Sequence, residues 1–262
     1  MGIISVHPLL LRWQGAESSF GTTPAFWGQN SMGLNLPQRP CANVYFDGFN
    51  FYYGCFKNSN RRHWQSYKWL DLAAFIQKVF PNYSINRIRY FTALVNSNPL
   101  DPGQQTRQLT YLRALQTIPN LSVHQGRFAR TAKKRWEADP RSFLPPYKPV
   151  IANPIRTVGV IEEEEKGSDV NLASYMLIDG FAGEYDIGVI ISNDSDLAEP
   201  IRLVKSVMGL KVALLNPRAQ TATDLQGIAD VYRTIRLGPI MASQFPSSLT
   251  DANGIITRPT AW

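Results

Sequence analysis

Two nearly continuous apolar runs constrain the fold of this chain more than any other feature. The runs are YDIGVIIS (185–192) and LKVALLN (210–216), and the segment between them, SDLAEPIRLVKSVMG (195–209), has the pattern of a helix. Strands without alternating polar residues are typical of parallel sheets, in which both faces are buried. Parallel neighbours also need a crossover connection, which a helix supplies. These runs therefore predict an α/β fold built on a parallel sheet.

The rest of the chain alternates in the same way. Further strands are expected at 41–46, 85–95, 121–129 and 156–165, and helices at 69–80, 101–119 and 167–182, with a short helix and an edge strand within 218–240. Residues 1–40 lack periodicity and are expected to form a loose N-terminal extension. Residues 41–240 would form one domain, interrupted by a proline-rich basic insert at about 131–155, an arm or an irregular loop. Residues 241–262 are expected to form an extended C-terminal tail.

The net charge of +7 favours a polyanionic partner. Basic residues gather with aromatic ones in KNSNRRHWQSYKW (57–69) and GRFARTAKKRW (126–136), a mixture that suits single-stranded nucleic acid. The alternative is a pair of surface loops whose rings pack on the core. The residues expected to contact phosphate in the second segment are Arg127, Arg130, Lys133 and Lys134.

Several other classes of protein are disfavoured. No apolar run approaches the roughly 20 residues that span a bilayer, and the N-terminus lacks the pattern of a secretory signal. The two cysteines, Cys41 and Cys55, do not have metal-ligand spacing and are read as reduced thiols of a cytoplasmic protein. Three scattered histidines do not indicate a zinc site. A membrane partner is not expected, whereas a protein partner or a homo-oligomer stays open.

Aspartates stand where predicted strands end. Asp47 follows VYF, and Asp194 and Asp196 follow the run YDIGVIIS. In open parallel sheets the functional crevice lies at the carboxyl ends of the strands. Asp169 is the next candidate, in the first turn of its predicted helix, where a carboxylate meets the positive end of the helix. Carboxylates that converge in one crevice repel one another unless a cation lies between them, and Mg²⁺ or Mn²⁺ accepts such oxygen ligands. Taken singly, Asp169 and Asp196 also fit a structural role at a helix start.

Polar residues beside these acids are candidates for substrate binding. Asn50 can contact a phosphate or orient a ligand, and Ser192 and Asn193 can either do the same or fix the loop through backbone bonds. Lys166 can neutralise a phosphate or pair with the preceding glutamates. Of those glutamates, Glu165 is the one expected to approach the site.

Three blocks of sequence resemble the NYN domain family, a branch of the PIN-like nucleases. They are VYFDGFNFYYG (44–54), EEKGSDVNLASYMLIDG (164–180) and DIGVIISNDSDLAEPIR (186–202), and the resemblance covers roughly residues 41–240. It implies a PIN-like three-layer α/β sandwich with a central, mostly parallel sheet flanked by helices. It also implies a metal-dependent acidic site at Asp47, Asp169, Asp194 and Asp196, with Asn50 beside it, and activity on RNA. The family often has glycine where this chain has Asn193, which affects the loop and leaves both acids in place.

The resulting hypothesis is a magnesium- or manganese-dependent ribonuclease, expected to be an endoribonuclease, that acts on single-stranded RNA. Metal-assisted attack by water needs no serine, cysteine or histidine nucleophile. An RNA-binding or regulatory module that retains the acidic pocket without useful turnover is the alternative. A phosphatase of the haloacid dehalogenase type is disfavoured because Phe49 stands where its second acid belongs. Rossmann-type nucleotide binding is disfavoured because no G-x-G-x-x-G follows a strand.

Overall fold

The apolar runs form neighbouring strands of a six-stranded parallel sheet. The computed structural model describes residues 39–57, 59–97, 99–139, 149–220 and 222–262, so nearly all of the predicted N-terminal extension (1–40) lies outside the described residues. The strand order is β3-β2-β1-β6-β7-β8, and every neighbouring pair is parallel. The strands are β1 (Cys41–Asp47), β2 (Ser84–Thr92), β3 (Leu121–Gln125), β6 (Ile187–Ile191), β7 (Lys211–Asn216) and β8 (Val231–Thr234).

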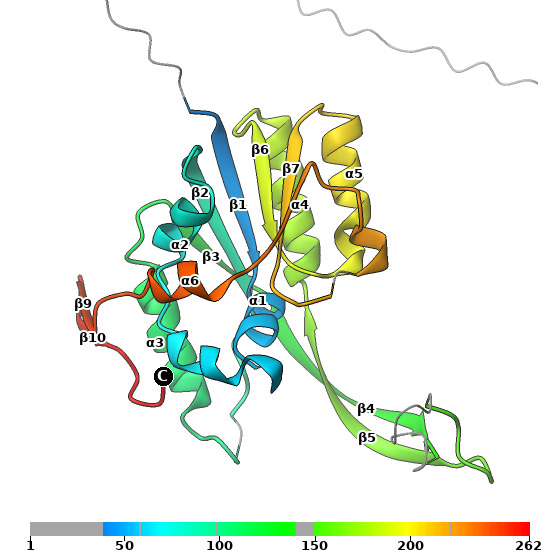
Figure 1. Ribbon diagram of the computed structural model, residues 1–262. Coiled ribbons are helices and arrows are strands. Elements are labelled where there is room, and N and C mark those ends of the chain that lie inside the picture. Colours follow the sequence, from blue (N-terminus) through cyan, green and yellow to red (C-terminus); the bar gives the residue numbers. More distant parts are fainter. Residues whose placement is uncertain (1–38, 58, 98, 140–148, 221) are drawn as a thin grey trace, which may run out of the picture. The chain divides into compact units, whose positions relative to one another are not determined.

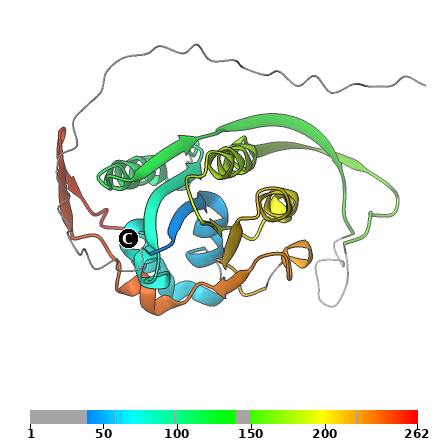
Figure 2. The same cartoon turned by 90° about the horizontal axis from the view of Figure 1, so that it is seen from above.

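Helices cover both faces of this sheet (Figures 1 and 2), which confirms the predicted three-layer α/β sandwich. The first face packs against α1 (Gly48–Cys55), α2 (Leu72–Val79), α3 (Gln104–Leu115) and α6 (Leu237–Met241), together with the 3-10 segment η1 (Ser59–Tyr67). The second face packs against α4 (Ser168–Phe181) and α5 (Ala198–Ser206), near the short 3-10 turns η3 (Ser195–Leu197) and η4 (Thr223–Leu225).

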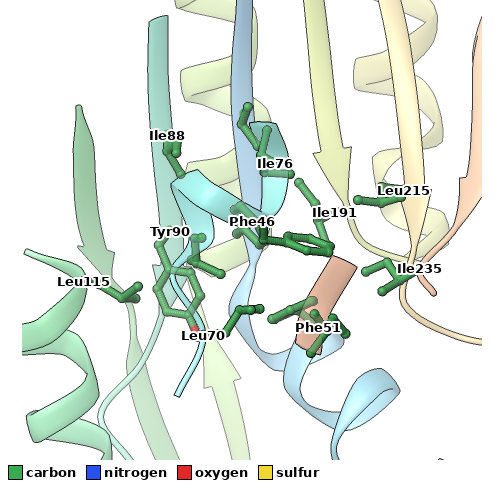
Figure 3. Packing of buried hydrophobic residues seen from close by; sticks show 14 of the residues in the cluster. Phe46, Phe51, Leu70, Ile76, Ile88, Tyr90, Leu115, Ile191, Leu215 and Ile235 are labelled. Carbon is green, nitrogen blue, oxygen red and sulfur yellow. The ribbon is translucent and has the colours of Figure 1, made fainter. Parts of the chain in front are cut away.

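Strand β1 shows how one segment serves both layers. Successive side chains of a strand point to opposite faces, and Val44 and Phe46 lie in the core on the α1–α2–α3 side, whereas Tyr45 lies in the core on the α4–α5 side. Figure 3 shows part of the first core, where Phe46 lies near Phe51 of α1. Strand β1 is thus buried on both faces, in the middle of the sheet.

The segment predicted as a single strand at 121–129 divides between two sheets. Strand β3 ends at Gln125, and the backbone N of Gly126 makes a last bond to Thr92 O of β2 at 2.7 Å. The chain then continues as β4 (Arg127–Trp136), which pairs antiparallel with β5 (Thr157–Lys166) and forms an arm that extends from the domain (Figure 1). The predicted insert at 131–155 therefore begins as regular strand. Its residues 140–148 lie outside the described residues.

The C-terminal residues form a hairpin and not the extended tail predicted for 241–262. Strands β9 (Ser248–Asp251) and β10 (Gly254–Thr257) are antiparallel. Asp251 accepts a bond from the backbone N of Asn253 at 2.8 Å, and Gly254 adopts a φ of 106°, so this turn uses the conformational freedom of glycine. Trp262 then packs against Tyr111 of α3, with ring centroids 5.6 Å apart.

Cys41 and Cys55 are both free thiols. Among the described residues, no helix has the length and apolar character that crossing a membrane requires.

Candidate metal centre

The pairing of β1 with β6 brings two of the predicted acidic positions to one edge of the sheet. Phe46 lies opposite Ile191 in this parallel pair. Asp47 is the last residue of β1, and Asp194 lies in the loop that follows β6. Both side chains therefore stand at the carboxyl ends of adjacent strands, where parallel α/β sheets hold their ligands.

Asp47 is held in one orientation by neutral hydrogen-bond donors. Its side chain is nearly buried, and its Oδ1 accepts a bond from the backbone N of Asn50 at 2.9 Å. Its Oδ2 accepts bonds from Asn50 Nδ2 at 2.8 Å and from Ser192 Oγ at 2.7 Å. The motif DGFN thus caps the start of α1. Burial raises the pKa of Asp47, and these bonds oppose that rise.

The loop after β6 orients Asp194 in turn. The backbone N of Asp194 donates to Ser192 Oγ at 3.0 Å, so this one hydroxyl links Asp47 to the loop. Asp194 Oδ1 accepts a bond from the backbone N of Asp196 at 3.0 Å and caps η3. Asp196 itself is exposed.

The third carboxylate comes from α4, in the helical layer on the second face of the sheet. Asp169 lies in the first turn of α4, where Gly167 adopts a φ of 100° and lets the chain turn from β5 into the helix. Glu165 Oε1 accepts a bond from the backbone N of Ser168 at 3.2 Å. Ligand atoms of Asp47, Asp169 and Asp194 all lie within 4.8 Å of one another. Three elements distant in sequence therefore contribute one carboxylate each.

The cluster concentrates negative charge. Burial, and then the neighbouring charges of Asp47, Asp194, Glu165 and Asp196, raise the pKa of Asp169 to about 7. Within the described part of the chain, no ion pair joins a lysine or arginine to Asp47, Asp169 or Asp194. The fold therefore keeps carboxylates together without a cationic side chain to offset their repulsion.

The donor set fits a hard divalent cation. Carboxylate and amide oxygens are the ligands that Mg²⁺ and Mn²⁺ prefer. Asn50 Oδ1, beside the cluster, is buried and has no hydrogen-bond partner among the described residues. Asp47, Asp169 and Asp194 are the residues that could hold the ion, and Asn50 Oδ1 is a further oxygen that could face it.

Comparison with known sequences agrees with this geometry. The sequence model of the NYN domain matches residues 42–236. The chain belongs to the NYN domain family. The predicted resemblance is thereby confirmed, and with it the relation to PIN-like nucleases.

Two individual proteins are similar over most of this NYN chain. One is a protein of Pseudomonas putida (strain DSM 28022 / S16) named 6-hydroxy-3-succinoylpyridine 3-monooxygenase HspA, which is 28% identical over 84% of this chain and 74% of its own length. The other is a crystal structure of a protein of unknown function, VPA0982, from Vibrio parahaemolyticus RIMD 2210633. It is 15% identical, with a TM-score of 0.48, over 81% of this chain and all of that one.

Two predicted substrate-binding residues of the NYN chain have other partners. Asn193 Oδ1 accepts a bond from the backbone N of Ala222 at 3.0 Å and so joins the loop after β6 to the start of η4. Lys166 Nζ lies 2.5 Å from Glu164 Oε2, one of the preceding glutamates. Both observations correspond to the structural alternative that the sequence left open.

The basic arm carries its own counterions. Arg130 pairs with Glu163, and Lys133 pairs with Glu162 and Glu164 across the β4–β5 ladder. The other two residues predicted to contact phosphate, Arg127 and Lys134, are exposed. The cross-strand register determines which cations face glutamates, and the sequence did not specify that register.

In the other basic segment, 57–69, the two tryptophans belong to the core, while the basic residues around them are exposed or half-buried. Trp64 is nearly buried and Trp69 fully buried, and the guanidinium of Arg61 lies 4.3 Å from the Trp64 ring centroid. Its tryptophans therefore pack inside the domain, as in the alternative reading, and cannot stack on bases.

Tyr90 is a neighbour of the cluster that the sequence analysis missed. It pairs with Phe46 in the β1–β2 ladder. Burial, followed by the charge of Asp47, raises its pKa above the ordinary range. A tyrosine near the end of a strand adjacent to β1 is the signal that could have identified it.

Proposed function

We propose that the protein is a divalent-metal-dependent ribonuclease that hydrolyses phosphodiester bonds in RNA at Asp47, Asp169 and Asp194. The observation that carries this proposal is the convergence of three carboxylates, from β1, α4 and the loop after β6, with no cationic partner among the residues that the structure describes. Membership of the NYN family supports the reaction class. The net charge of +7 supports a polyanionic substrate.

The protein's own groups prepare the site. Ser192 and Asn50 orient Asp47, and Ser192 also fixes Asp194 through its backbone N, so two of the three carboxylates share one positioning residue. A bound Mg²⁺ or Mn²⁺ ion supplies electrostatic stabilisation of the phosphate and makes water a better nucleophile. Asp196, exposed at the rim, adds negative charge near Asp169 and is proposed as an outer member of the acidic set.

The test is cleavage of a defined single strand by the purified protein. RNA and DNA of the same sequence are incubated with Mg²⁺, Mn²⁺ or a chelator, and products are resolved by length, which also separates internal from terminal cleavage. Metal-dependent cleavage of RNA is the expected result, and Asp47→Asn should abolish it. The matched control is Asp186→Asn, at the opposite end of β6, where an exposed aspartate accepts a bond from Cys41 N. Cleavage by Asp47→Asn at the parent rate would overturn the assignment.

The Pseudomonas relative introduces a second candidate. Its similarity spans 84% of this chain, and it is named for a monooxygenase reaction on a substituted hydroxypyridine. Incubation of the protein with that compound, O₂ and a reduced nicotinamide donor tests this activity by loss of substrate absorbance. Substrate loss without RNA cleavage would favour this candidate. RNA binding without cleavage or substrate loss would favour a regulatory module that retains the acidic cluster.

A further inference from the structure

A pocket of about 370 Å³ opens beside the acidic cluster, on the α1–α3 side of the sheet. This volume falls within the roughly 300–1,000 Å³ of small-molecule sites. Its aromatic lining includes Tyr52 and Tyr53 of α1, Tyr111 of α3, and Trp262. Such rings provide flat faces against which another planar ring can pack.

The same pocket has an excess of positive charge. Lys57, Lys68 and Arg107 line it together with a single acid, Asp101, which pairs with Arg107. Among the described residues, neither Lys57 nor Lys68 forms a salt bridge, although the charge of Asp101 acts on Lys68. Lys68 is partly buried, with its Nζ 5.9 Å from the Tyr52 ring centroid. With three cations against one acid, the pocket favours an anionic group.

Gly48 connects the pocket to the acidic cluster along the chain. Gly48, which follows Asp47, lines the pocket beside Tyr90. A Cβ at Gly48 would lie only 2.6 Å from Phe91 O and 2.9 Å from the Tyr90 hydroxyl oxygen, so glycine permits this close approach. The pocket therefore reaches Gly48, one residue along the chain from Asp47, although Asp47 itself does not line it.

We propose that this pocket binds a planar heteroaromatic ring that carries an anionic group, namely the nucleotide of the RNA that neighbours the scissile phosphate. The base would pack against Tyr52 and Tyr53, and its phosphate would lie near Lys57 and Lys68. This assignment rests on the proposed ribonuclease function for its substrate. The ligand chemistry itself, a flat heterocycle with a negative charge, is shared by nucleotides and by small pyridine carboxylates.

The first measurement is calorimetric binding in the presence of chelator, so that cleavage does not contribute. The probes are adenosine and uridine 5′-monophosphate, with nicotinate as the small heteroaromatic acid. Both nucleotides should bind, and Lys68→Gln should weaken that binding by about 10-fold, the loss of one charged contact. Tyr53→Ala tests the ring contact at a half-exposed side chain. The matched control is Lys78→Gln, an exposed lysine of α2 outside this pocket.

The second measurement uses RNA cleavage to separate this proposal from the function on which it rests. Lys68→Gln should raise KM for RNA with kcat retained, whereas Asp47→Asn should lose kcat and still bind the mononucleotides. Nucleotide binding without any RNA cleavage would retain the pocket and reject the nuclease. The pocket assignment would be overturned if neither nucleotide bound, whether or not nicotinate did. It would also be overturned if Lys68→Gln, shown to unfold at the same temperature as the parent, kept the parent affinity for nucleotides and the parent KM for RNA.

Discussion

Two buried carboxylates, Asp179 of α4 and Asp47 of β1, differ in how their charge is compensated. Asp179 of α4 accepts bonds from Arg89 Nη2 at 2.7 Å, from Arg89 Nε at 2.8 Å and from the Tyr45 hydroxyl at 2.9 Å. Asp47 is equally buried, at 3% exposed in both cases, but its side-chain partners are Ser192 and Asn50, which are neutral.

The difference indicates a structural role for Asp179 and a ligand-binding role for the cluster that contains Asp47. A buried carboxylate that serves only the fold is normally paired with a cation and fully hydrogen-bonded. Asp179 meets that description, and the Arg89 guanidinium also lies 4.3 Å from the Tyr175 ring centroid. The acidic cluster is oriented by the fold while the described part of the chain provides no counterion for it, as expected of a site that receives a cation from solution. The following predictions test this contrast.

The largest effect on stability is expected from Asp179→Ala. The substitution leaves the Arg89 guanidinium buried without its counterion and should lower the free energy of unfolding by about 3–5 kcal/mol. Chemical denaturation of the purified variants measures this change. The double variant Arg89→Met, Asp179→Leu should recover most of the loss. A single variant as stable as the parent would contradict the structural role of this pair.

A divalent ion should stabilise the parent protein and not Asp47→Asn. An ion that binds only the folded state adds about 2.7 kcal/mol when its concentration is 100 times Kd. Thermal unfolding across a Mn²⁺ titration measures this shift. Asp186→Asn serves as the control and should respond like the parent. An equal shift in Asp47→Asn would place the ion elsewhere.

The metal-free protein should lose stability as pH rises from about 4 to about 7. The pKa of Asp169 is about 7 in the folded protein against an ordinary value of 3.8, so the folded state binds more protons than the unfolded state across this window. Because Asp169 is only partly buried, solvent screening reduces the effect to about 1–2 kcal/mol. Denaturation at a series of pH values should show this slope, and Asp169→Asn or saturating Mn²⁺ should flatten it. A parent slope unaffected by Asp169→Asn would exclude this cause.

Ser192→Ala should have a smaller effect on stability, about 1 kcal/mol, because it removes the hydroxyl that links Asp47 to the Asp194 backbone. RNA cleavage should fall by about 10- to 100-fold, as for other residues that orient metal ligands. Comparison with Asn193→Ala separates the two roles. Asn193 lies in the same loop as Ser192, and its replacement removes the bond from the backbone N of Ala222. This variant should be less stable than the parent without a comparable loss in the rate of RNA cleavage.

The smallest effect is expected in the arm. The pair between Arg130 and Glu163 is exposed to solvent, so Arg130→Gln should change the free energy of unfolding by less than about 0.5 kcal/mol. Cleavage of RNA by this variant measures whether Arg130 contacts phosphate despite its pairing with Glu163. A rise in KM would support the contact that the sequence predicted, and an unchanged KM would reject it.

The sequence predicted the parts of the molecule that depend on local pattern. The apolar runs around 187–191 and 211–216 predicted buried parallel strands because such runs cannot be half-exposed. Aspartates at strand ends predicted an acidic cluster, and the structure brings Asp47, Asp169 and Asp194 together. Asp196 is exposed and stands outside that group of three, since its place in the turn of η3 is fixed by backbone geometry.

Features that depend on long-range pairing could not be predicted in this way. The pattern at 121–129 predicts one continuous strand. In the structure the pairing with β2 ends near Gly126, and the local sequence contains no sign of that end. The register of β4 against β5 brings Lys133 close to Glu162 and Glu164. These two strands are separated in the sequence by part of the insert, so the local pattern does not determine how they align. The apolar residues of the C-terminal hairpin gain a partner only once α3 is folded beside them.

The central position of β1 and β6 has a consequence for synthesis of the protein. Asp47 is made early and Asp194 much later, and the pairing of their two strands is what unites them. A growing chain that has not yet reached β6 therefore lacks the assembled acidic cluster. If the cluster cleaves RNA as proposed, the ribosome and the message being translated are exposed to that activity only after most of the domain has been made.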